Sequence, residues 1–235
     1  MDSPSGALEV ENVAVHYGKF VAVASASFIV SPGEFVAIIG PNGHGKSSLV
    51  NSLAGLVQRS GEVRINGQRL APRNPKAAVT AGLVLVPERR HLYPGLSVRD
   101  NILLGSYVKT RRFLAERAWE DVAEVLDVFP ELTNLLNQRA GTLSGGQQQM
   151  VALARAMAAK PEIIMLDEPC LGLAEAVSKR VYEWLAMMTK TNMTILLVEE
   201  NPVHALQAAD RALEMYKGVM SVPDTSAFRE GSPTA

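Results

Sequence analysis

The sequence lacks most of the features that mark specialised classes of protein. Its one cysteine, Cys170, can form no internal disulfide, which fits a reducing compartment. No apolar run approaches the roughly 18 residues of a membrane-spanning helix. The polar, acidic start at residues 1–5 does not resemble a secretory signal. Lys and Arg number 23 against 24 Asp and Glu, and this balance argues against a cationic nucleic-acid binder. We expect a soluble intracellular protein that binds no nucleic acid.

The residues that are present describe an ordinary globular chain. It has 235 residues, of which 47% are hydrophobic and 20% are charged. This length allows one large domain, or one domain with an insertion, and it is enough to bury a sizeable core. Residues 223–235 are polar and contain proline, serine and glycine, so we expect a loose tail there.

Four short apolar runs are typical of strands buried on both faces of a parallel sheet. They are residues 35–39, 83–86, 163–166 and 194–198. Two other segments predict a small antiparallel layer. Residues 8–13 alternate between apolar and polar, and residues 62–70 contain an Asn-Gly pair that favours a tight hairpin turn.

Apolar stripes at helical spacing separate several of these strands. Residues 118–129 and 147–159 each carry one, and residues 92–141 contain no buried-strand run. Alternation of strands and helices favours an α/β fold. The sequence therefore predicts a mainly parallel core sheet, a small antiparallel β layer and an inserted helical subdomain.

A phosphate-binding loop follows the first buried strand. It reads Gly40-Pro41-Asn42-Gly43-His44-Gly45-Lys46-Ser47-Ser48 and matches the pattern G-x-x-x-x-G-K-[ST]. Backbone N–H groups and the start of the next helix would face the phosphates. We expect Lys46 to reach the β- and γ-phosphates and Ser47 to bind Mg²⁺. The alternative is a glycine-rich turn with an incidental lysine. For His44 we expect a solvated side chain whose backbone N–H does the binding.

Two carboxylates end the buried strand at residues 163–166. Buried carboxylates are costly unless they are paired or bound to metal. Strand alternation points Asp167 and Glu168 to different sides, so we expect different roles. Asp167 suits the metal shell, and Glu168 suits a general base that polarises the attacking water. The alternative is an acidic pair that merely begins a helix.

A second helix start suited to anions lies further along the chain. Its residues are Leu143, Ser144, Gly145, Gly146 and Gln147. Ser144 can cap the helix that follows, and the two glycines leave backbone N–H groups accessible. Two anion sites in one chain make sense if the second site of one subunit closes on the first site of another. We therefore expect a head-to-tail dimer with two shared nucleotides.

Taken together, residues 40–48, 143–147 and 163–169 resemble the ATP-binding subunits of ABC (ATP-binding cassette) transporters. The resemblance covers about residues 8–222 and implies the P-loop NTPase fold of an ABC cassette. It implies a single domain over residues 1–222, with a RecA-like core at about 1–90 and 155–222 and a helical subdomain at about 91–154. A finer resemblance is to the subunits of branched-chain amino-acid importers, with urea-import relatives close. It is carried by residues 86–90, 95–101, 171–174 and 197–201.

The resemblance assigns further roles. It places Tyr17 where the family stacks an aromatic ring on adenine, although Tyr17 can also be read as a tyrosine of the core or an edge strand. Glu88 stands where most ABC proteins have a glutamine that contacts Mg²⁺ and the attacking water. Residues 92–104 would dock against the membrane partner. The basic residues 89–91 would either contact that partner or face solvent. The implied cofactors are ATP and Mg²⁺.

Two positions depart from the family pattern. Glu200 stands where most ABC ATPases have a switch histidine, and an ionised carboxylate beside a γ-phosphate would be repelled. We expect Glu200 to point away, to be protonated, or to slow hydrolysis. Cys170 replaces a common serine, and there we expect packing rather than thiol chemistry.

The resemblance implies an ATPase that powers import from the cytoplasmic face of the plasma (inner) membrane. Implied partners are transmembrane permease subunits, a second ATPase subunit of the same or a related chain, and an extracytoplasmic substrate-binding protein. Two other readings stay open. A soluble ABC ATPase of DNA repair or translation would need a long coiled coil or a second cassette, and neither is visible in the sequence. A degenerate cassette is supported only by Glu200.

Overall fold

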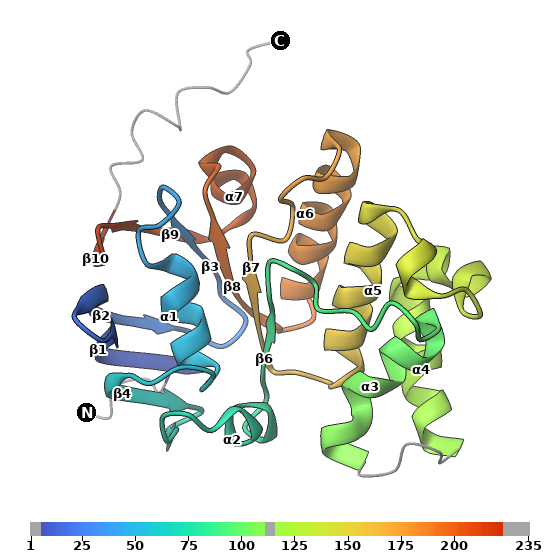
Figure 1. Ribbon diagram of the computed structural model, residues 1–235, viewed down its shortest axis with the longest axis horizontal. Helices are drawn as coiled ribbons and strands as arrows, with labels where there is room; N and C mark the ends of the chain where they lie inside the picture. Colours follow the sequence, from blue (N-terminus) through green and yellow to red (C-terminus); the bar gives the residue numbers. More distant parts are fainter. Residues whose placement is uncertain (1–5, 111–115, 223–235) are drawn as a thin grey trace.

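The fold is built on one ten-stranded sheet whose two halves differ in character (Figure 1). The computed structural model describes residues 6–110 and 116–222. The strand order is β5-β4-β1-β2-β10-β9-β3-β8-β7-β6. Antiparallel strands, drawn blue and cyan in Figure 1, form one end, and parallel strands run beside helices at the other. The predicted combination of a parallel core with a small antiparallel layer is confirmed.

The parallel half contains the four strands that the apolar runs predict. They are β3 (Phe35–Ile39), β8 (Thr194–Glu199), β7 (Ile163–Asp167) and β6 (Leu83–Val86). Neighbours in this order pair in parallel. Every residue of β3, β7 and β8 is buried, whereas β6 lies at the sheet edge and is partly exposed. Central strands covered on both faces account for the unbroken apolar runs.

The antiparallel half contains β1 (Leu8–Tyr17), β2 (Phe20–Val30), β4 (Ser60–Ile65) and β5 (Gln68–Arg69). The predicted hairpin turn joins β4 to β5, with φ of 49° at Asn66 and 75° at Gly67. Two strands that the sequence analysis did not identify connect the halves. Strand β9 (Arg211–Tyr216) pairs in parallel with β3, and β10 (Val219–Ser221) pairs with both β9 and β2.

Strand alternation divides the interior into two cores. On β3, Phe35 and Ala37 face one cluster, and Val36 and Ile38 face the other. The first cluster includes residues of α5 (Gly145–Ala158) and α6 (Glu175–Thr189), and the second includes residues of α1 (Lys46–Leu53). Helices α1 and α5 therefore cover opposite faces of the sheet.

The helices at the far end of the sheet stand beside β6 (Figure 1). They are α3 (Val98–Thr110), α4 (Glu116–Val128), η1 (Pro130–Leu135) and η2 (Ala140–Thr142), and they pack with α5. Two smaller helices, α2 (Pro75–Thr80) and α7 (Pro202–Ala208), complete the fold. The helical content predicted for residues 92–141 is confirmed. The predicted domain boundary at about residue 154 falls inside α5, and residues 223–235 lie outside the described residues.

The expected docking surface at residues 92–104 is only partly a surface. Val98 and Ile102 are fully buried in the core because they face inward from α3. Tyr93 and Leu96 are the large apolar side chains of this segment that stay exposed. Part of this segment therefore belongs to the core, and docking of its exposed residues against a partner stays a prediction. Among the described residues, no helix is long and apolar enough to cross a membrane.

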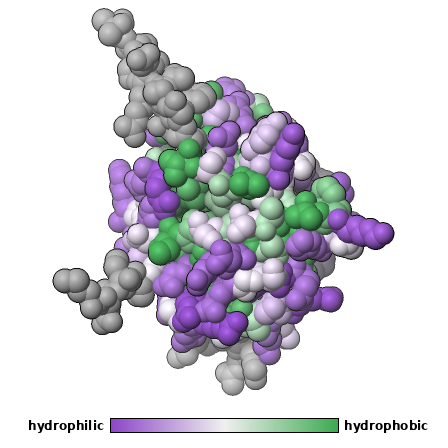
Figure 2. Space-filling view, turned by 90° about the vertical axis from the view of Figure 1, so that its left-hand side faces the viewer, coloured by the Kyte–Doolittle hydropathy of each residue, from purple (hydrophilic) through white to green (hydrophobic). Residues whose placement is uncertain are grey.

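The antiparallel end of the molecule carries scattered apolar side chains on its surface. Phe20, Val21, Ile29 and Val219 are among the exposed ones. Figure 2 views this end and shows the apolar residues interrupted by hydrophilic ones. Isolated exposed apolar side chains of this kind are ordinary in folded proteins.

Gly105 allows α3 to pack closely against α5. A Cβ atom at this position would overlap the carbonyl oxygen of Arg155 on α5, whereas a Cβ at exposed Gly95 would meet nothing within 4 Å. We expect Gly105→Ala to lower the free energy of unfolding by about 1–3 kcal/mol, because overpacking outweighs the better helix propensity of alanine. Urea denaturation measures this change. Gly95→Ala is the matched control, and an equal effect of the two substitutions would contradict the packing argument.

Candidate functional site

The phosphate loop lies between β3 and α1 and is backed closely by other backbone segments. Gly45 has a φ of 103°, and a Cβ there would run into the carbonyl oxygen of Ala22. A Cβ at Gly40 would run into the carbonyl oxygen of Met215. Gly43 also has a positive φ, 78°, but faces open space. Glycine is therefore required at Gly40 and Gly45 by close backbone approach, which keeps N–H groups of the loop available for an anion.

Lys46 begins α1 and lies across the mouth of this loop. Its ammonium group donates to the carbonyl oxygens of Gly40 at 2.7 Å and Pro41 at 3.1 Å. It also forms an ion pair with Glu168, whose nearest oxygen is 3.4 Å away. Lys46 is only 3% exposed, so these contacts stabilise a charge that would otherwise be costly to bury.

Ser47 and Asp167 meet between α1 and β7. The Ser47 hydroxyl donates to Oδ1 of Asp167 at 3.0 Å. Asp167 has the same parity on β7 as Ile163 and Met165, which face the core on the α1 side. The pKa of Asp167 is raised to about 6: burial is the largest cause, the Ser47 hydrogen bond opposes it, and the nearby Glu168 and Glu88 carboxylates add to the rise.

This pair of oxygen ligands fits Mg²⁺, which prefers carboxylate, hydroxyl and phosphate oxygens. A bound cation would also compensate the buried carboxylate. Within the described ranges, no group of three or more His, Cys, Asp or Glu side chains could hold a metal by itself. A Mg²⁺ ion would therefore need phosphate oxygens or water to complete its coordination.

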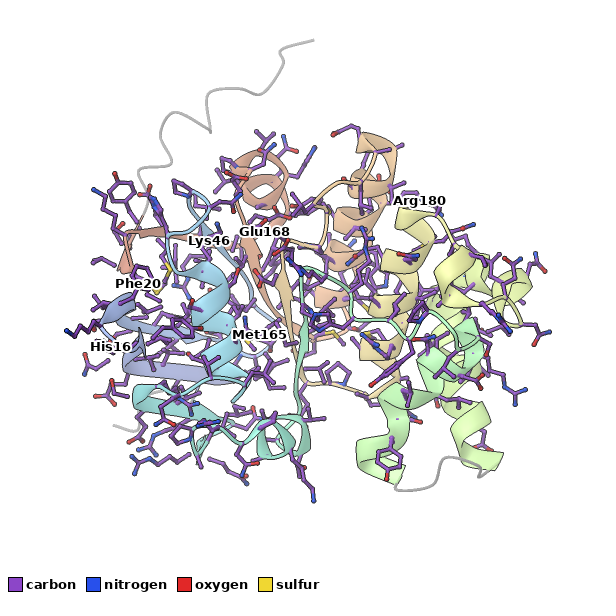
Figure 3. The ribbon with its side chains drawn as sticks, viewed as in Figure 1. His16, Phe20, Lys46, Met165, Glu168 and Arg180 are labelled. Atoms are coloured by element: carbon purple, nitrogen blue, oxygen red, sulfur yellow. The ribbon has the colours of Figure 1, made fainter. Side chains whose placement is uncertain are left out.

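Glu168 occupies a bend immediately after β7. Its φ of 47° turns the chain out of the strand, and its N–H donates to the carbonyl oxygen of Val198 at 2.9 Å. Figure 3 shows Glu168 and Lys46 at the same edge of the sheet, with Met165 deeper along β7. Asp167 contacts Ser47 while Glu168 faces Lys46, which agrees with the expectation that the two carboxylates point to different sides.

Glu200 is turned toward the phosphate loop. Its carboxylate accepts a hydrogen bond of 2.7 Å from the side-chain amide of Asn42. Of the three alternatives for Glu200, the first, that it points away, does not hold, and the other two stay predictions. The Asn42 amide supplies a donor that holds the carboxylate at the loop, a contact between residues far apart in the sequence.

His44 is half-buried, which corrects the expectation of a solvated side chain. Its ring meets the ring of Tyr216 edge to face, with 4.7 Å between centroids. Its Nδ1 atom is buried without a hydrogen-bond partner. The carbonyl oxygen of His44 accepts from the N–H of Gly218, which ties the loop to the β9–β10 turn. Ser48, which follows the loop pattern, is half-buried on α1.

The loop after β6 is fastened to α5. Nε of Arg90 donates to the Gln149 side chain at 2.9 Å, and the Arg155 guanidinium donates to the carbonyl oxygens of Arg90 and His91. Arg90 is therefore held against α5, and contact of the basic residues 89–91 with a membrane partner stays a prediction. Glu88, earlier in this loop, is exposed yet close enough to raise the pKa of Asp167.

Tyr17 ends β1 at the sheet edge opposite Phe20 and is 49% exposed. A ring in this position is accessible to a base, so its role in adenine stacking stays a prediction. Cys170 packs against the core, and its Sγ approaches the carbonyl oxygen of Ser178 at 3.9 Å. Burial raises the pKa of this thiol to about 12, which agrees with packing rather than thiol chemistry.

The predicted second anion site is a well-formed helix start. The Gln147 N–H donates to the Ser144 hydroxyl, and the Ser144 N–H donates to the Gln147 side chain, so the two form a capping box. Gly145 and Gly146 form the first turn, and Leu143 before them is buried. Helices α1 and α5 pack on opposite faces of the sheet, so the phosphate loop and this helix start belong to different layers of one chain.

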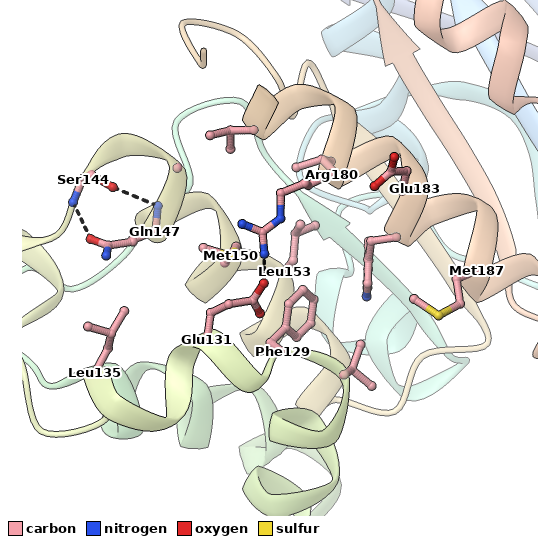
Figure 4. A pocket seen from close by; sticks show the side chains of 15 residues that line it. Phe129, Glu131, Leu135, Ser144, Gln147, Met150, Leu153, Arg180, Glu183 and Met187 are labelled. Carbon is pink, nitrogen blue, oxygen red and sulfur yellow. Dashed lines mark hydrogen bonds and ion pairs between the residues drawn. The ribbon is translucent and has the colours of Figure 1, made fainter. Parts of the chain in front are cut away.

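A groove of about 510 Å³ lies beside this helix start, between α5, α6 and η1 (Figure 4). Phe129, Met150 and Trp184 contribute apolar walls. Across it, Arg180 of α6 forms an ion pair with Glu131 of η1. This pair links α6 to the helical region that carries the helix start.

A buried pair of residues next to the phosphate loop, Glu199 and Tyr182, was not identified in the sequence analysis. Glu199 of β8 accepts a hydrogen bond of 2.9 Å from the hydroxyl of Tyr182 on α6, and both residues are buried. Glu199 directly follows the apolar run at residues 194–198, and a carboxylate at the end of a buried strand is a signal that could have identified it. Nothing local in the sequence indicates its partner.

Comparison with known proteins now places the chain. Residues 23–171 match the family described as ABC transporter. The chain is 36% identical to the high-affinity branched-chain amino acid transport ATP-binding protein BraG of Pseudomonas aeruginosa, over 94% of this chain and 93% of that protein. The chain belongs to the ABC transporter ATP-binding family. This ABC ATPase is also 34% identical to the fructose import ATP-binding protein FrcA of Rhizobium meliloti, over 87% of this chain and 82% of that protein.

Solved structures agree with the fold of an ABC ATPase. An ATP-binding cassette of an ABC transporter in its ADP conformation aligns with a TM-score of 0.84 at 24% identity, covering 95% of each chain. A dimeric bacterial ABC transporter cassette aligns with a TM-score of 0.81 at 26% identity, over 92% of this chain and 98% of that one. The predicted P-loop NTPase fold is confirmed.

The capping box of this ABC ATPase gives a test of the helix start. We expect Ser144→Ala to lower the free energy of unfolding by about 1 kcal/mol, because it leaves the Gln147 N–H without its side-chain acceptor. Urea denaturation measures the change. Ser144→Thr keeps a hydroxyl and is the control. If the threonine and alanine variants lose equal stability, the hydroxyl does not stabilise the helix start.

Proposed function

We propose that this ABC ATPase hydrolyses ATP to power an importer of branched-chain amino acids. The observation that carries the ATPase part is the meeting of Lys46, Ser47, Asp167 and Glu168 at one edge of the sheet. A degenerate cassette would not need all four. The substrate part is supported by the similarity to the branched-chain amino acid relative.

In this proposal, Mg²⁺·ATP supplies the phosphoryl group and the cation that neutralises its charge. The N–H groups of residues 40–45 and the ammonium group of Lys46 bind phosphate oxygens. To do so, Lys46 exchanges its carbonyl partners in the loop for phosphate. Ser47, Asp167 and Glu88 hold the metal, and Tyr17 stacks on the adenine.

Glu168 acts as the general base that orients and polarises the attacking water. Its burial beside Lys46 restricts the carboxylate to the edge of the phosphate loop. The bend at Glu168 separates this carboxylate from the metal-binding Asp167, so each carries one role.

Residues 143–147 act in a second subunit, of the same or a related chain. A head-to-tail dimer would bring the helix start of one subunit to the phosphate loop of the other. This is supported by a cassette of similar fold that has a dimeric structure. The closed pair acts on transmembrane permease subunits at the cytoplasmic face of the plasma (inner) membrane, and an extracytoplasmic substrate-binding protein delivers the substrate.

The substrate class is tested by uptake. A strain lacking this chain should lose high-affinity uptake of labelled leucine, isoleucine and valine, and the wild-type chain should restore it. The Lys46→Ala chain should not. Unchanged amino-acid uptake with loss of urea uptake would favour the urea and amide alternative. Loss of fructose uptake would favour a sugar importer, in line with the similarity to the fructose relative.

Glu168→Gln should reduce ATP hydrolysis by about 10²-fold or more, because it removes the general base and keeps the shape of the side chain. ATP binding should persist, so the variant should accumulate an ATP-bound dimer that size-exclusion chromatography with light scattering detects. The exposed Glu183→Gln is the control. A Glu168→Gln chain that stays monomeric with ATP would remove Glu168 from this role.

Glu200→Gln should tighten ATP binding by about threefold to tenfold. The amide can still accept the hydrogen bond from Asn42, but the substitution removes a charge that repels the γ-phosphate. Because Glu200 is exposed, solvent and salt screen this repulsion to about 1 kcal/mol. ADP binding should change less, because ADP lacks that phosphate. Titration calorimetry measures both affinities. Glu175→Gln, which removes another exposed carboxylate, is the control, and equal effects on ATP and ADP would overturn the γ-phosphate argument.

A further inference from the structure

The buried carboxylate of Glu199 has no part in the site described above. Glu199 is the last residue of β8 and is 6% exposed. It has the parity of Ile195 and Leu197, which face the core on the α6 side. This parity places Glu199 on the opposite face of the sheet from Asp167.

Tyr182 is the side chain that satisfies Glu199 from α6. Its hydroxyl donates to Oε1 of Glu199 at 2.9 Å, and Tyr182 itself is 8% exposed. The Glu200 backbone also hydrogen-bonds to this carboxylate, so Tyr182 supplies its side-chain donor but not its whole compensation. Removal of the Tyr182 hydroxyl would leave a buried carboxylate that is less well compensated, and removal of the Glu199 carboxylate would leave the hydroxyl without its acceptor.

The backbone at the end of β8 is hydrogen-bonded both to the phosphate loop and to the bend that carries Glu168. The carbonyl oxygen of Glu199 accepts from the N–H of Gly40 at 3.3 Å, where the phosphate loop begins. The carbonyl oxygen of Val198 accepts from the N–H of Glu168 at 2.9 Å. Fixing the end of β8 therefore fixes the first residue of the loop and the bend that carries Glu168.

Glu199 also shares a cavity of about 230 Å³ with Glu168 and Tyr182. The other titratable side chains lining it are Cys170, Glu175, Glu200 and His204. His204 contacts Glu175 at 2.8 Å, and its ring lies 5.4 Å from that of Tyr182 between centroids. Burial raises the pKa of Glu199 to about 7; the Tyr182 hydrogen bond and the charge of Lys46 oppose this, and the charge of Glu168 adds to it.

We propose that Glu199 and Tyr182 are positioning residues for ATP hydrolysis, because their buried hydrogen bond fixes the end of β8 to which both the phosphate loop and Glu168 are bonded. This inference rests on the proposed role of Glu168. Glu199 has a second effect through its charge. When it is ionised it adds a buried negative charge beside Glu168, at a site that must accept anionic phosphates.

Two conservative variants separate the hydrogen bond from the charge. Glu199→Gln keeps an acceptor for Tyr182 and loses the charge, so its rate of ATP turnover should match wild type at pH 6 and exceed it by about threefold at pH 8. Tyr182→Phe keeps the charge and loses the donor, so kcat should fall by about threefold to tenfold, and further at pH 8 than at pH 6. Turnover by the full chain with Mg²⁺ and ATP between pH 6 and 8 measures both.

Glu175→Gln alters the same cavity without touching the pair and should leave the profile unchanged. The double variant Glu199→Leu, Tyr182→Phe replaces both polar groups by apolar ones and preserves a folded chain if a single variant does not fold. Its kcat should be lower than that of the wild type, and the part of the pH dependence that comes from Glu199 between pH 6 and pH 8 should be lost. Wild-type kcat and an unchanged pH profile in this double variant would overturn the proposal.

Thermal unfolding tests the pair without nucleotide. An acid whose folded pKa is raised makes the wild type less stable as pH rises from its ordinary value of 4.5 toward about 7. Glu199→Gln lacks this loss, so its melting temperature should rise relative to wild type between pH 5 and 8. The melting temperature of Tyr182→Phe should be lower than that of the wild type by about 3 °C or more, and the difference should be larger at pH 8 than at pH 5.

The outcomes distinguish this inference from the proposed function. If Glu168→Gln abolishes turnover while Glu199→Gln and Tyr182→Phe leave both the rate profile and the melting temperatures unchanged, the positioning role is wrong and the ATPase assignment stands. If Glu168→Gln turns over ATP like wild type, the proposed role of Glu168 fails, and the positioning role that rests on it fails as well.

Discussion

The catalytic edge of the sheet is organised around the buried ammonium group of Lys46. Two carboxylates, Asp167 and Glu168, end β7, and Glu199 ends β8, all of them buried. Each would destabilise the fold if left unpaired. Lys46 neutralises Glu168 directly, the Ser47 hydroxyl donates to Asp167, and the Tyr182 hydroxyl donates to Glu199. This excess of negative charge creates the electrostatic need for a cation that Mg²⁺ would meet.

Strand alternation decides which face of the sheet Asp167 and Glu199 point to. Asp167 faces α1 because its parity on β7 matches that of Met165, whereas Glu199 faces α6 because its parity on β8 matches that of Leu197. Glu168 leaves the strand through a positive φ and faces neither core. One sheet edge therefore presents the proposed metal ligand on one face, the proposed positioning group on the other, and the proposed base between them.

The same two-faced sheet separates the phosphate loop and the capping box into different layers of the fold. The phosphate loop leads into α1 on one face, and the capping box begins α5 on the other. Arg90, Gln149 and Arg155 link the loop after β6 to α5, and the Arg180–Glu131 pair links α6 to η1. These contacts connect the loop after β6 and helix α6 to the helical region.

The sequence by itself determined the local features. The glycine pattern of residues 40–48, the buried runs, the Asn66-Gly67 turn and the cap at Ser144 each depend on neighbours in the chain, and each was found where predicted. The short strands β9 and β10 escaped prediction because their stability comes from pairing with β2 and β3 rather than from a periodic apolar pattern. Only the tertiary structure decided the partners of Glu200, His44, Arg90 and Glu199. Their contacts with Asn42, Tyr216, Gln149 and Tyr182 join residues distant in the chain, and such contacts form only when the packed sheet brings those residues together.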